Sequence, residues 1–380
     1  MSCIEDLLRC ITSNKTVLNN SRIAIVITNL HVGGAERVAI NLANSFSRIG
    51  YLVDVVLLSA TGELIDELLP EIRVVDLQVK RMREVLTPLI RYIRKNRPNA
   101  LLANMWPITS ITLCACKLAM VKTRLVVVEH TTWSKSEICK SPFRRWQAAT
   151  TMRFTLPFAD GIVAVSDGAA DDLARFANLN RNDITVIYNP IVGEVKVTSL
   201  HQINDWSESK YPVLAVGKLK VVKDFATLLK AFSILINHLD AKLLILGEGE
   251  CRLALELQAK QLGISDKVIM PGFVKDTTSF YEQANLCVVT SVAEGFSNVI
   301  VESLAAGTPV VSTDCPSGPS EILCNGKFGK LVPVGDSLAL AQAMLDSLAS
   351  DYNRDALISR AQDFSIDKSA KKYIHILLER

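Results

Sequence analysis

Short runs of Val, Ile and Leu recur along the chain, each followed by a loop and by a segment with the apolar spacing of a helix. Runs that are apolar at nearly every position and alternate with amphipathic helices are typical of strands buried on both faces of a parallel sheet. In the first half of the chain the runs are Ile23 to Thr28, Leu52 to Leu58, Ile72 to Asp76, Ala100 to Ala103, Leu125 to Val128 and Gly161 to Val165. They predict one doubly wound α/β domain.

The alternation stops near residue 190 and begins again after a polar, aperiodic segment over 191–211, which we interpret as a linker. The later runs are Val213 to Gly217, Lys242 to Gly247, Val268 to Met270, Leu286 to Thr290 and Pro309 to Thr313. A chain of 380 residues is expected to form two domains at roughly 150 residues each. We expect Rossmann-like domains at 1–195 and 196–365, and a final helix over 366–380 that packs back toward the first. Since ligands bind beyond the carboxyl ends of parallel strands, two such domains facing each other would enclose a central cleft.

Composition favours a globular protein in a reducing compartment. Nearly half of the residues are hydrophobic, and the nine cysteines are odd in number and lie mostly in apolar runs, as buried thiols do. Cys114 and Cys116 lack a second pair of ligands, so we expect no zinc there. The first 20 residues include acidic side chains and no long apolar stretch, which predicts neither a signal peptide nor an anchor. A net charge of +3 is too small to indicate nucleic-acid binding.

A bounded helix with an anion-attracting end is predicted after the run Leu286 to Thr290. Ser297 is a suitable N-cap, Gly307 is suited to the position after the helix, and Pro309 prevents continuation, so about nine residues are expected to be helical. The first-turn amides of such a helix lack intrahelical partners and, with the helix dipole, attract an anion such as a diphosphate.

Acceptor side chains flank that helix end. Asn298 and Glu302 are four residues apart and share a face, while Glu294 precedes the helix. Carboxylates suit sugar hydroxyls because they accept two hydrogen bonds. The alternative is that Glu302 is a solvated helix residue and Glu294 a loop charge.

The string EGFSNVIVESLAAGTPVV, which begins at Glu294, resembles the signature of glycosyltransferase family 4, a group of retaining enzymes with the GT-B fold. Other strings follow in the order found in that family: GGAERV, VAVSDG, VIYNP, VGKLKVVKDF, LGEG, PGF and GKLVPVGD. The similarity extends from about Ile23 to the C-terminus. It implies an α/β protein with the GT-B fold, two Rossmann-like domains that face a central cleft.

The resemblance implies roles for individual residues. Glu302 would bind the ribose of the nucleotide, and Glu294 the hydroxyls of the donor sugar. The other donor-binding positions implied are Gly272, Phe273, Gly295, Phe296, Ser297 and Asn298.

Lys218 and Lys223 follow the run Val213 to Gly217, and Asp224 is placed to cap the next helix. At a strand end both lysines would face the ligand, where ammonium groups stabilise the charge that grows on a departing diphosphate. The alternative is a pair of solvated surface lysines. The family usually has Arg at the first of these positions, so the planar guanidinium is lost and the charge is kept. The chain has no Asp-x-Asp, and we expect neither a metal nor another cofactor.

Two loops of the first domain carry further candidates. Gly33 and Gly34 follow the first strand without the three-glycine spacing of nicotinamide-binding proteins, and the resemblance implies contact with the donor diphosphate or the acceptor. His130 ends the run Leu125 to Val128, and a single His is often structural. The family has a functional His at this strand end close to the donor sugar, so we include His130 in the active site without assigning it proton transfer.

The acceptor is expected to be membrane-bound. Cations cluster in the first half of the chain, and the segment Pro142 to Trp146 mixes them with aromatic side chains, as at a lipid surface. Leu86, Leu89, Ile90 and Ile93 form an apolar stripe that either contributes to this surface or packs on the domain's own sheet. Segment 313–323 resembles bacterial members that make surface polysaccharides or lipid-linked oligosaccharides.

The predicted function is therefore that of a cytoplasmic retaining glycosyltransferase, peripheral on the inner face of the cell membrane. It would move a hexose or N-acetylhexosamine from a nucleotide sugar, with UDP expected, to an undecaprenyl-diphosphate-linked or polysaccharide acceptor in O-antigen, capsule or related glycan synthesis. The resemblance implies a front-face displacement in which the leaving phosphate helps to deprotonate the acceptor. Two alternatives stay open: a nucleotide-sugar epimerase of the same fold, and a non-catalytic subunit that binds sugar nucleotides.

Overall fold

The computed structural model describes residues 21–193 and 203–379 and divides into two compact units. The first unit comprises Met1–Val165, Ala169–Pro190 and Ile366–Arg380, and the second Ser166–Gly168 and Ile191–Ser365. The N-terminal segment, with Cys3 and Cys10, and the middle of the predicted linker lie outside the described residues. Within the described ranges, no helix combines the length and the apolar character needed to cross a bilayer.

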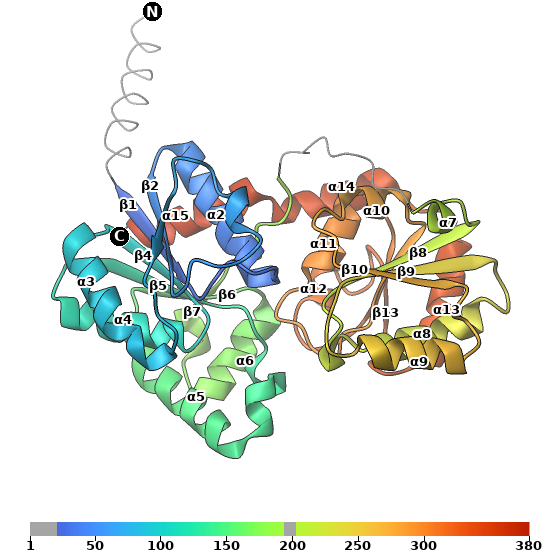
Figure 1. Ribbon diagram of the computed structural model, residues 1–380, viewed down its shortest axis with the longest axis horizontal. Helices are drawn as coiled ribbons and strands as arrows, with labels where there is room; N and C mark the ends of the chain where they lie inside the picture. The colour runs from blue at the N-terminus through green and yellow to red at the C-terminus, as the bar shows by residue number, and fades with distance from the viewer. Residues whose placement is uncertain (1–20, 194–202, 380) are drawn as a thin grey trace, which may run out of the picture. The chain divides into compact units, whose positions relative to one another are not determined.

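The first unit is built on a seven-stranded sheet in the order β3-β2-β1-β4-β5-β6-β7 (Figure 1). All neighbouring strands are parallel. The strands are β1 (Arg22–Ile27), β2 (Leu52–Leu57), β3 (Arg73–Asp76), β4 (Ala100–Asn104), β5 (Arg124–Glu129), β6 (Gly161–Ala164) and β7 (Ile184–Val186). The six runs predicted in this half of the chain each form a strand, whereas the three-residue β7 was not predicted.

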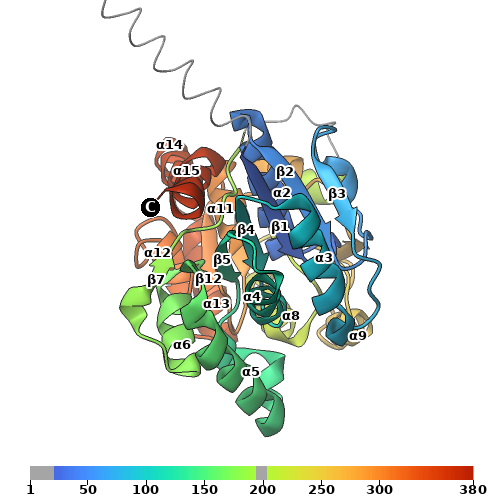
Figure 2. The ribbon, with the colours of Figure 1, turned by 90° about the vertical axis from the view of Figure 1, so that its left-hand side faces the viewer.

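Helices surround this sheet: α2 (Gly34–Ile49), α3 (Leu86–Asn96), α4 (Ile108–Ala119), α5 (Pro142–Thr155), α6 (Asp167–Ala177) and α15 (Ile366–Leu378). Helices α3 and α4 lie side by side (Figures 1 and 2). The C-terminal helix α15 packs against α2, β4 and β5. Gly161 allows this approach, since a Cβ there would come within 2.8 Å of Ile376 Cγ2.

The second unit contains a six-stranded parallel sheet in the order β10-β9-β8-β11-β12-β13. Its strands are β8 (Tyr211–Val216), β9 (Ala241–Leu246), β10 (Val268–Gly272), β11 (Leu286–Val289), β12 (Val310–Thr313) and β13 (Lys330–Val332). Its helices are α7 (Asn204–Ser207), α8 (Phe225–Leu235), α9 (Arg252–Gln261), α10 (Thr278–Gln283), α11 (Asn298–Ala305), α12 (Pro319–Ile322), α13 (Ser337–Leu348) and α14 (Arg354–Ala361). Buried side chains of β8, β9, α8 and α13 share one hydrophobic core.

Both sheets are doubly wound, as predicted, because the strand order reverses beside the first strand of each unit. The reversal lies between β1 and β4 in the first unit and between β8 and β11 in the second. Loops that leave neighbouring strands in opposite directions at such a point leave a crevice for ligands at the carboxyl edge of the sheet. Ligands are therefore expected beside the loops after β1, β4, β8 and β11.

Candidate functional site

Two of the predicted residues meet at the switch point of the second unit. Lys223 ends the short 3-10 helix η7 (Val221–Lys223) after β8, and Glu294 lies in the loop after β11. The Lys223 Nζ atom is 2.6 Å from Glu294 Oε1, and Ser291 Oγ donates a hydrogen bond of 2.6 Å to the same oxygen. Both side chains of the ion pair are largely shielded from solvent, at 25% and 11% exposed. A cation and a carboxylate are thus held in contact beyond the carboxyl ends of two adjacent parallel strands.

The backbone around Lys223 is fixed from both sides. Thr290 Oγ1 donates to the Lys223 carbonyl at 2.8 Å, which ties the two loops together. Asp224 caps α8 as predicted, since its carboxylate accepts from the Thr227 amide and hydroxyl. Asp224 also has a left-handed φ of 46°, which turns the chain sharply into the helix. Lys218 is exposed in the loop after β8 and does not share the ion pair of Lys223.

Helix α11 begins directly after Glu294 and its turn, close to the predicted bounds. It spans eight residues, and Gly307 follows its C-cap with a φ of 72°, as expected for the residue after a helix. The capping prediction for Ser297 was wrong in one respect. Ser297 occupies the N-cap position, but its side chain is buried and makes no capping hydrogen bond. Its hydroxyl therefore does not cover the first turn of the helix.

The turn from Gly295 to Ser297 is packed closely by neighbouring segments of the chain. Ser166 Oγ donates to the Gly295 carbonyl at 2.6 Å. Gly318 has a φ of 91°, and a Cβ there would lie 3.1 Å from Phe296 Cα and 3.2 Å from the Ser297 amide nitrogen. The Phe296 ring is buried against Phe364, with ring centroids 5.4 Å apart. Because its ring is buried, Phe296 can contact a ligand only through its backbone. The need for glycine at position 318 was not predicted.

Glu302 lies on α11 and is held by a residue that the sequence did not indicate. The hydroxyl of Tyr281, on α10, donates a 2.8 Å hydrogen bond to Glu302 Oε2. Burial raises the pKa of Tyr281 well above its ordinary value. The carboxylate proposed for ribose binding therefore has a permanent donor behind it.

Gly272 and Phe273 lie elsewhere along the sheet edge. Gly272 ends β10, which is separated from β8 by β9. Its φ of 103° favours glycine, and Phe273 is 46% exposed. The structure brings neither residue into the Lys223–Glu294 pair.

In the first unit, His130 follows β5 and joins Asn104, the last residue of β4. Its Nε2 atom is 3.1 Å from Asn104 Oδ1, and its Nδ1 atom is buried with no hydrogen-bond partner among the described residues. Because Asn104 Oδ1 accepts, the proton belongs on Nε2 and Nδ1 carries a lone pair. Burial lowers the pKa of His130 to about 4, so the ring is neutral near pH 7.

A buried carboxylate beside His130 was missed because it closes an apolar strand. Glu129 is 1% exposed and accepts hydrogen bonds from Thr109 Oγ1 at 2.9 Å and from the Trp106 amide at 3.2 Å. Burial outweighs these hydrogen bonds and raises the pKa of Glu129 to about 7. The group holds the turn between β4 and α4 in place.

The other predicted glycines begin α2. Gly33 is the N-cap with extended backbone, and Gly34 is the first helical residue. The carboxylate of Glu36 lies against Gly33, where a Cβ would otherwise be. A ligand at this helix end would therefore meet Glu36 as well as the two glycines.

Comparisons with known proteins match both units. Residues 196–364 match the family model described as glycosyl transferases group 1, and residues 32–193 match the model described as glycosyltransferase family 4. The Campylobacter jejuni enzyme named N-acetylgalactosamine-N,N'-diacetylbacillosaminyl-diphospho-undecaprenol 4-alpha-N-acetylgalactosaminyltransferase is 28% identical over 366 residues, which span 90% of this chain and 94% of that enzyme.

Solved structures agree on the fold. A glycosyltransferase from Rickettsia africae superposes with a TM-score of 0.76 at 18% identity over 95% of this chain and 100% of its own. An Anabaena protein crystallised with UDP and glucose gives a TM-score of 0.74 at 21% identity, over 94% of this chain and 99% of its own. The relatives are transferases, which does not favour an epimerase or a non-catalytic subunit. The chain is thus an enzyme of the α/β GT-B fold, and it belongs to the glycosyltransferases of family 4.

Proposed function

We propose that the enzyme transfers an N-acetylhexosamine or a hexose from a UDP-sugar to an undecaprenyl-diphosphate-linked or polysaccharide acceptor, with retention at the anomeric carbon. The Campylobacter relative, named for transfer to a diphospho-undecaprenol glycan, supports this acceptor class. The observation that carries the proposal is the Lys223–Glu294 pair, which lies at the switch point of the second unit just before α11. It combines a cation, a carboxylate and a helix N-terminus where a sugar diphosphate would bind.

Each group has a distinct task in this proposal. Lys223 and Lys218 stabilise negative charge on the departing diphosphate, and the first turn of α11 adds its amides. Glu294 accepts hydrogen bonds from the donor sugar and Glu302 from the ribose. In this proposal the negative charge on the leaving diphosphate is stabilised without a metal ion.

The remaining predicted contacts are backbone or neutral groups. Gly295, Phe296 and Ser297 would offer main-chain atoms to the donor, with Asn298, Gly272, Phe273 and the Gly33–Gly34 loop as further contacts. His130 is neutral, and its Nδ1 lone pair suits it to accept a hydrogen bond from a hydroxyl. We assign His130 this accepting role, and we assign deprotonation of the acceptor to the leaving phosphate in a front-face displacement.

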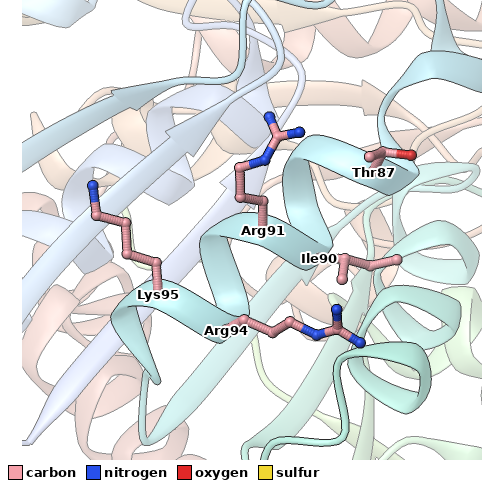
Figure 3. A pocket seen from close by; sticks show the side chains of 5 residues that line it. All are labelled: Thr87, Ile90, Arg91, Arg94 and Lys95. Atoms are coloured by element: carbon pink, nitrogen blue, oxygen red, sulfur yellow. The ribbon is translucent and has the colours of Figure 1, made fainter.

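Attachment to an anionic membrane surface is part of the proposal, and the exposure of side chains on α3 and α5 bears on which helix would face the membrane. Leu89 and Ile93 of the α3 stripe are buried inside the unit, where α3 packs against α4, whereas Leu86 and Ile90 are partly exposed. The cations of α3 are exposed around a shallow pocket of about 470 Å³ (Figure 3). There, Arg94 is turned to donate to the Leu118 carbonyl at the end of α4. Helix α3 thus offers exposed cations, with Ile90 as a partly exposed apolar side chain among them.

Helix α5 and the turn after it offer both kinds of side chain. Phe143, Trp146, Phe154 and Phe158 are between 63% and 68% exposed. Arg144, Arg145 and Arg153 are exposed on the same helix, which lies on the periphery of its unit (Figure 2). Exposed aromatic rings among cations suit the headgroup region of an anionic bilayer. We propose α5 as the membrane-facing element of an enzyme at the inner face of the cell membrane.

The test is a transfer assay with mass-spectrometric detection. The full chain is incubated with UDP-N-acetylhexosamines and UDP-hexoses, with and without an undecaprenyl-diphosphate-linked glycan, in the presence or absence of EDTA. We expect the acceptor to gain one sugar and UDP to be released, with EDTA making no difference. Epimerised donor in the absence of acceptor, or binding of donors without turnover across the panel, would overturn the proposal. Loss of transfer in EDTA would overturn its metal-independent part.

A further inference from the structure

Tyr281 is a buried residue with a hydroxyl aimed at one functional carboxylate. Its side chain lies on α10 and is 2% exposed. The hydroxyl is 2.8 Å from Oε2 of Glu302, which is half-buried on the adjacent helix α11. The hydrogen bond thus joins a rigid donor in the interior to a carboxylate at the site.

The backbone of Tyr281 is also tied to the end of α11. Thr308 Oγ1 donates to the Tyr281 carbonyl at 2.6 Å, and Ser303 Oγ donates to the Thr308 carbonyl at 3.0 Å. Helices α10 and α11 are thus linked at two places, so the Tyr281 hydroxyl has little freedom to move relative to Glu302. Because burial and the nearby Glu302 charge raise its pKa, the hydroxyl remains a donor throughout the ordinary pH range.

We infer that Tyr281 is a positioning residue that orients Glu302 for the donor ribose and sets the preference for ribose over 2′-deoxyribose. The inference rests on the ribose-binding role proposed for Glu302. A carboxylate contacts two adjacent hydroxyls well only when its plane is fixed, and a hydrogen bond from behind fixes that plane. A site built for a hydroxyl rejects a ligand that lacks it, because a buried polar group is then left without a partner. Loss of the Tyr281 hydroxyl would therefore weaken ribose recognition selectively.

The experiment compares UDP with 2′-deoxy-UDP by isothermal titration calorimetry on the full chain. Tyr281→Phe keeps the ring and removes only the donor. We expect the Kd for UDP to rise about tenfold and the Kd for 2′-deoxy-UDP to rise less than about threefold. The ratio of the Kd for 2′-deoxy-UDP to the Kd for UDP should therefore fall. Tyr373→Phe is the matched control, because Tyr373 is equally buried and its hydroxyl has no hydrogen-bond partner in the part of the chain that the structure describes. It should leave both Kd values unchanged.

A double-mutant cycle with Glu302→Ala separates positioning from general packing. In the Glu302→Ala background, Tyr281→Phe should have no further effect on the Kd for UDP, since the carboxylate to be oriented is gone. Equal losses for the two nucleotides, additive effects in the cycle, or unchanged binding in Tyr281→Phe would each overturn the inference while leaving the proposed function intact. If wild-type chain binds UDP no better than Glu302→Ala, the ribose-binding role itself fails, and the inference fails with it.

Discussion

Glu129→Gln should change how the stability of the first unit depends on pH. Glu129 is 1% exposed, and its pKa is raised from 4.5 to about 7 in the folded state. Between these pH values the folded protein holds a proton that the unfolded chain has lost. The stability contributed by the protonated group is therefore full below pH 4.5 and is lost as the pH rises through 7. At 1.36 kcal/mol per pH unit, this loss amounts to about 3 kcal/mol.

Gln imitates the protonated carboxyl group at every pH. Its carbonyl oxygen can accept from the Trp106 amide, and its NH₂ group can donate to the Thr109 hydroxyl. The free energy of unfolding of Glu129→Gln minus that of wild type should thus be about 3 kcal/mol larger at pH 8 than at pH 4.5, which means that the variant gains stability relative to wild type as the pH rises.

His130 makes stability rise with pH, opposite to Glu129, and this effect should become measurable in Glu129→Gln. Burial lowers its pKa from 6.5 to about 4, so the unfolded chain binds a proton that the folded state excludes. Its contribution to stability is present above pH 6.5 and is lost as the pH falls through 4. Glu129 and His130 oppose each other between pH 4.5 and 6.5 in the wild type. In Glu129→Gln, stability should rise with pH over that interval.

Urea unfolding followed by tryptophan fluorescence is a suitable assay, because Trp106 and Trp133 pack edge to face near Glu129 with ring centroids 6.0 Å apart. Glu137→Gln, which removes an exposed carboxylate of the same unit, is the control and should show little pH-dependent difference from wild type. If the difference in unfolding free energy between Glu129→Gln and wild type were the same at pH 4.5 and pH 8, burial would not raise the pKa of Glu129.

Three further predictions concern function. Lys223→Ala should lower kcat about 100-fold and change the donor Kd much less, since the ammonium stabilises charge that grows in the transition state. The control Lys220→Ala removes an exposed neighbouring lysine and should behave as wild type. Equal kinetics in the two variants would exclude the role of Lys223 in stabilising the leaving group. Glu302→Ala should weaken UDP binding at least about tenfold in calorimetry, and an unchanged Kd would contradict ribose binding. Trp146→Ala should reduce co-sedimentation with anionic liposomes at low salt. The control Leu257→Ala, which removes an exposed apolar side chain of the second unit, should not. If the wild-type chain itself stayed in the supernatant, the membrane proposal would be wrong.

The main architecture could be predicted because parallel strands buried on both faces leave an unbroken apolar run in the sequence. Strands β7 and β13 have three residues each, which is too short for such a run to stand out. The sequence indicated only that Lys223 and Glu294 each follow a strand, and it did not predict their contact. The contact forms because loops after adjacent parallel strands meet at one edge of the sheet.

Other features depend on side-chain direction, which the spacing of residue types does not encode. Ser297 has the right type and position for a cap, yet its side chain is buried. Glu129 and Tyr281 lie within apolar patterns, and only the fold brings a donor or an acceptor to each. For α3, the apolar stripe was compatible with a lipid surface or a protein core, and the burial of Leu89 and Ile93 places at least these two side chains in the core.

A crystal structure of the chain with a bound UDP-sugar would show which residues of the second unit contact the donor. We expect the diphosphate to lie within hydrogen-bond distance of Lys223 Nζ and of the first-turn amides of α11, with the ribose hydroxyls on Glu302 and the sugar on Glu294. A donor bound away from α11, or a diphosphate out of reach of Lys223, would contradict this expectation.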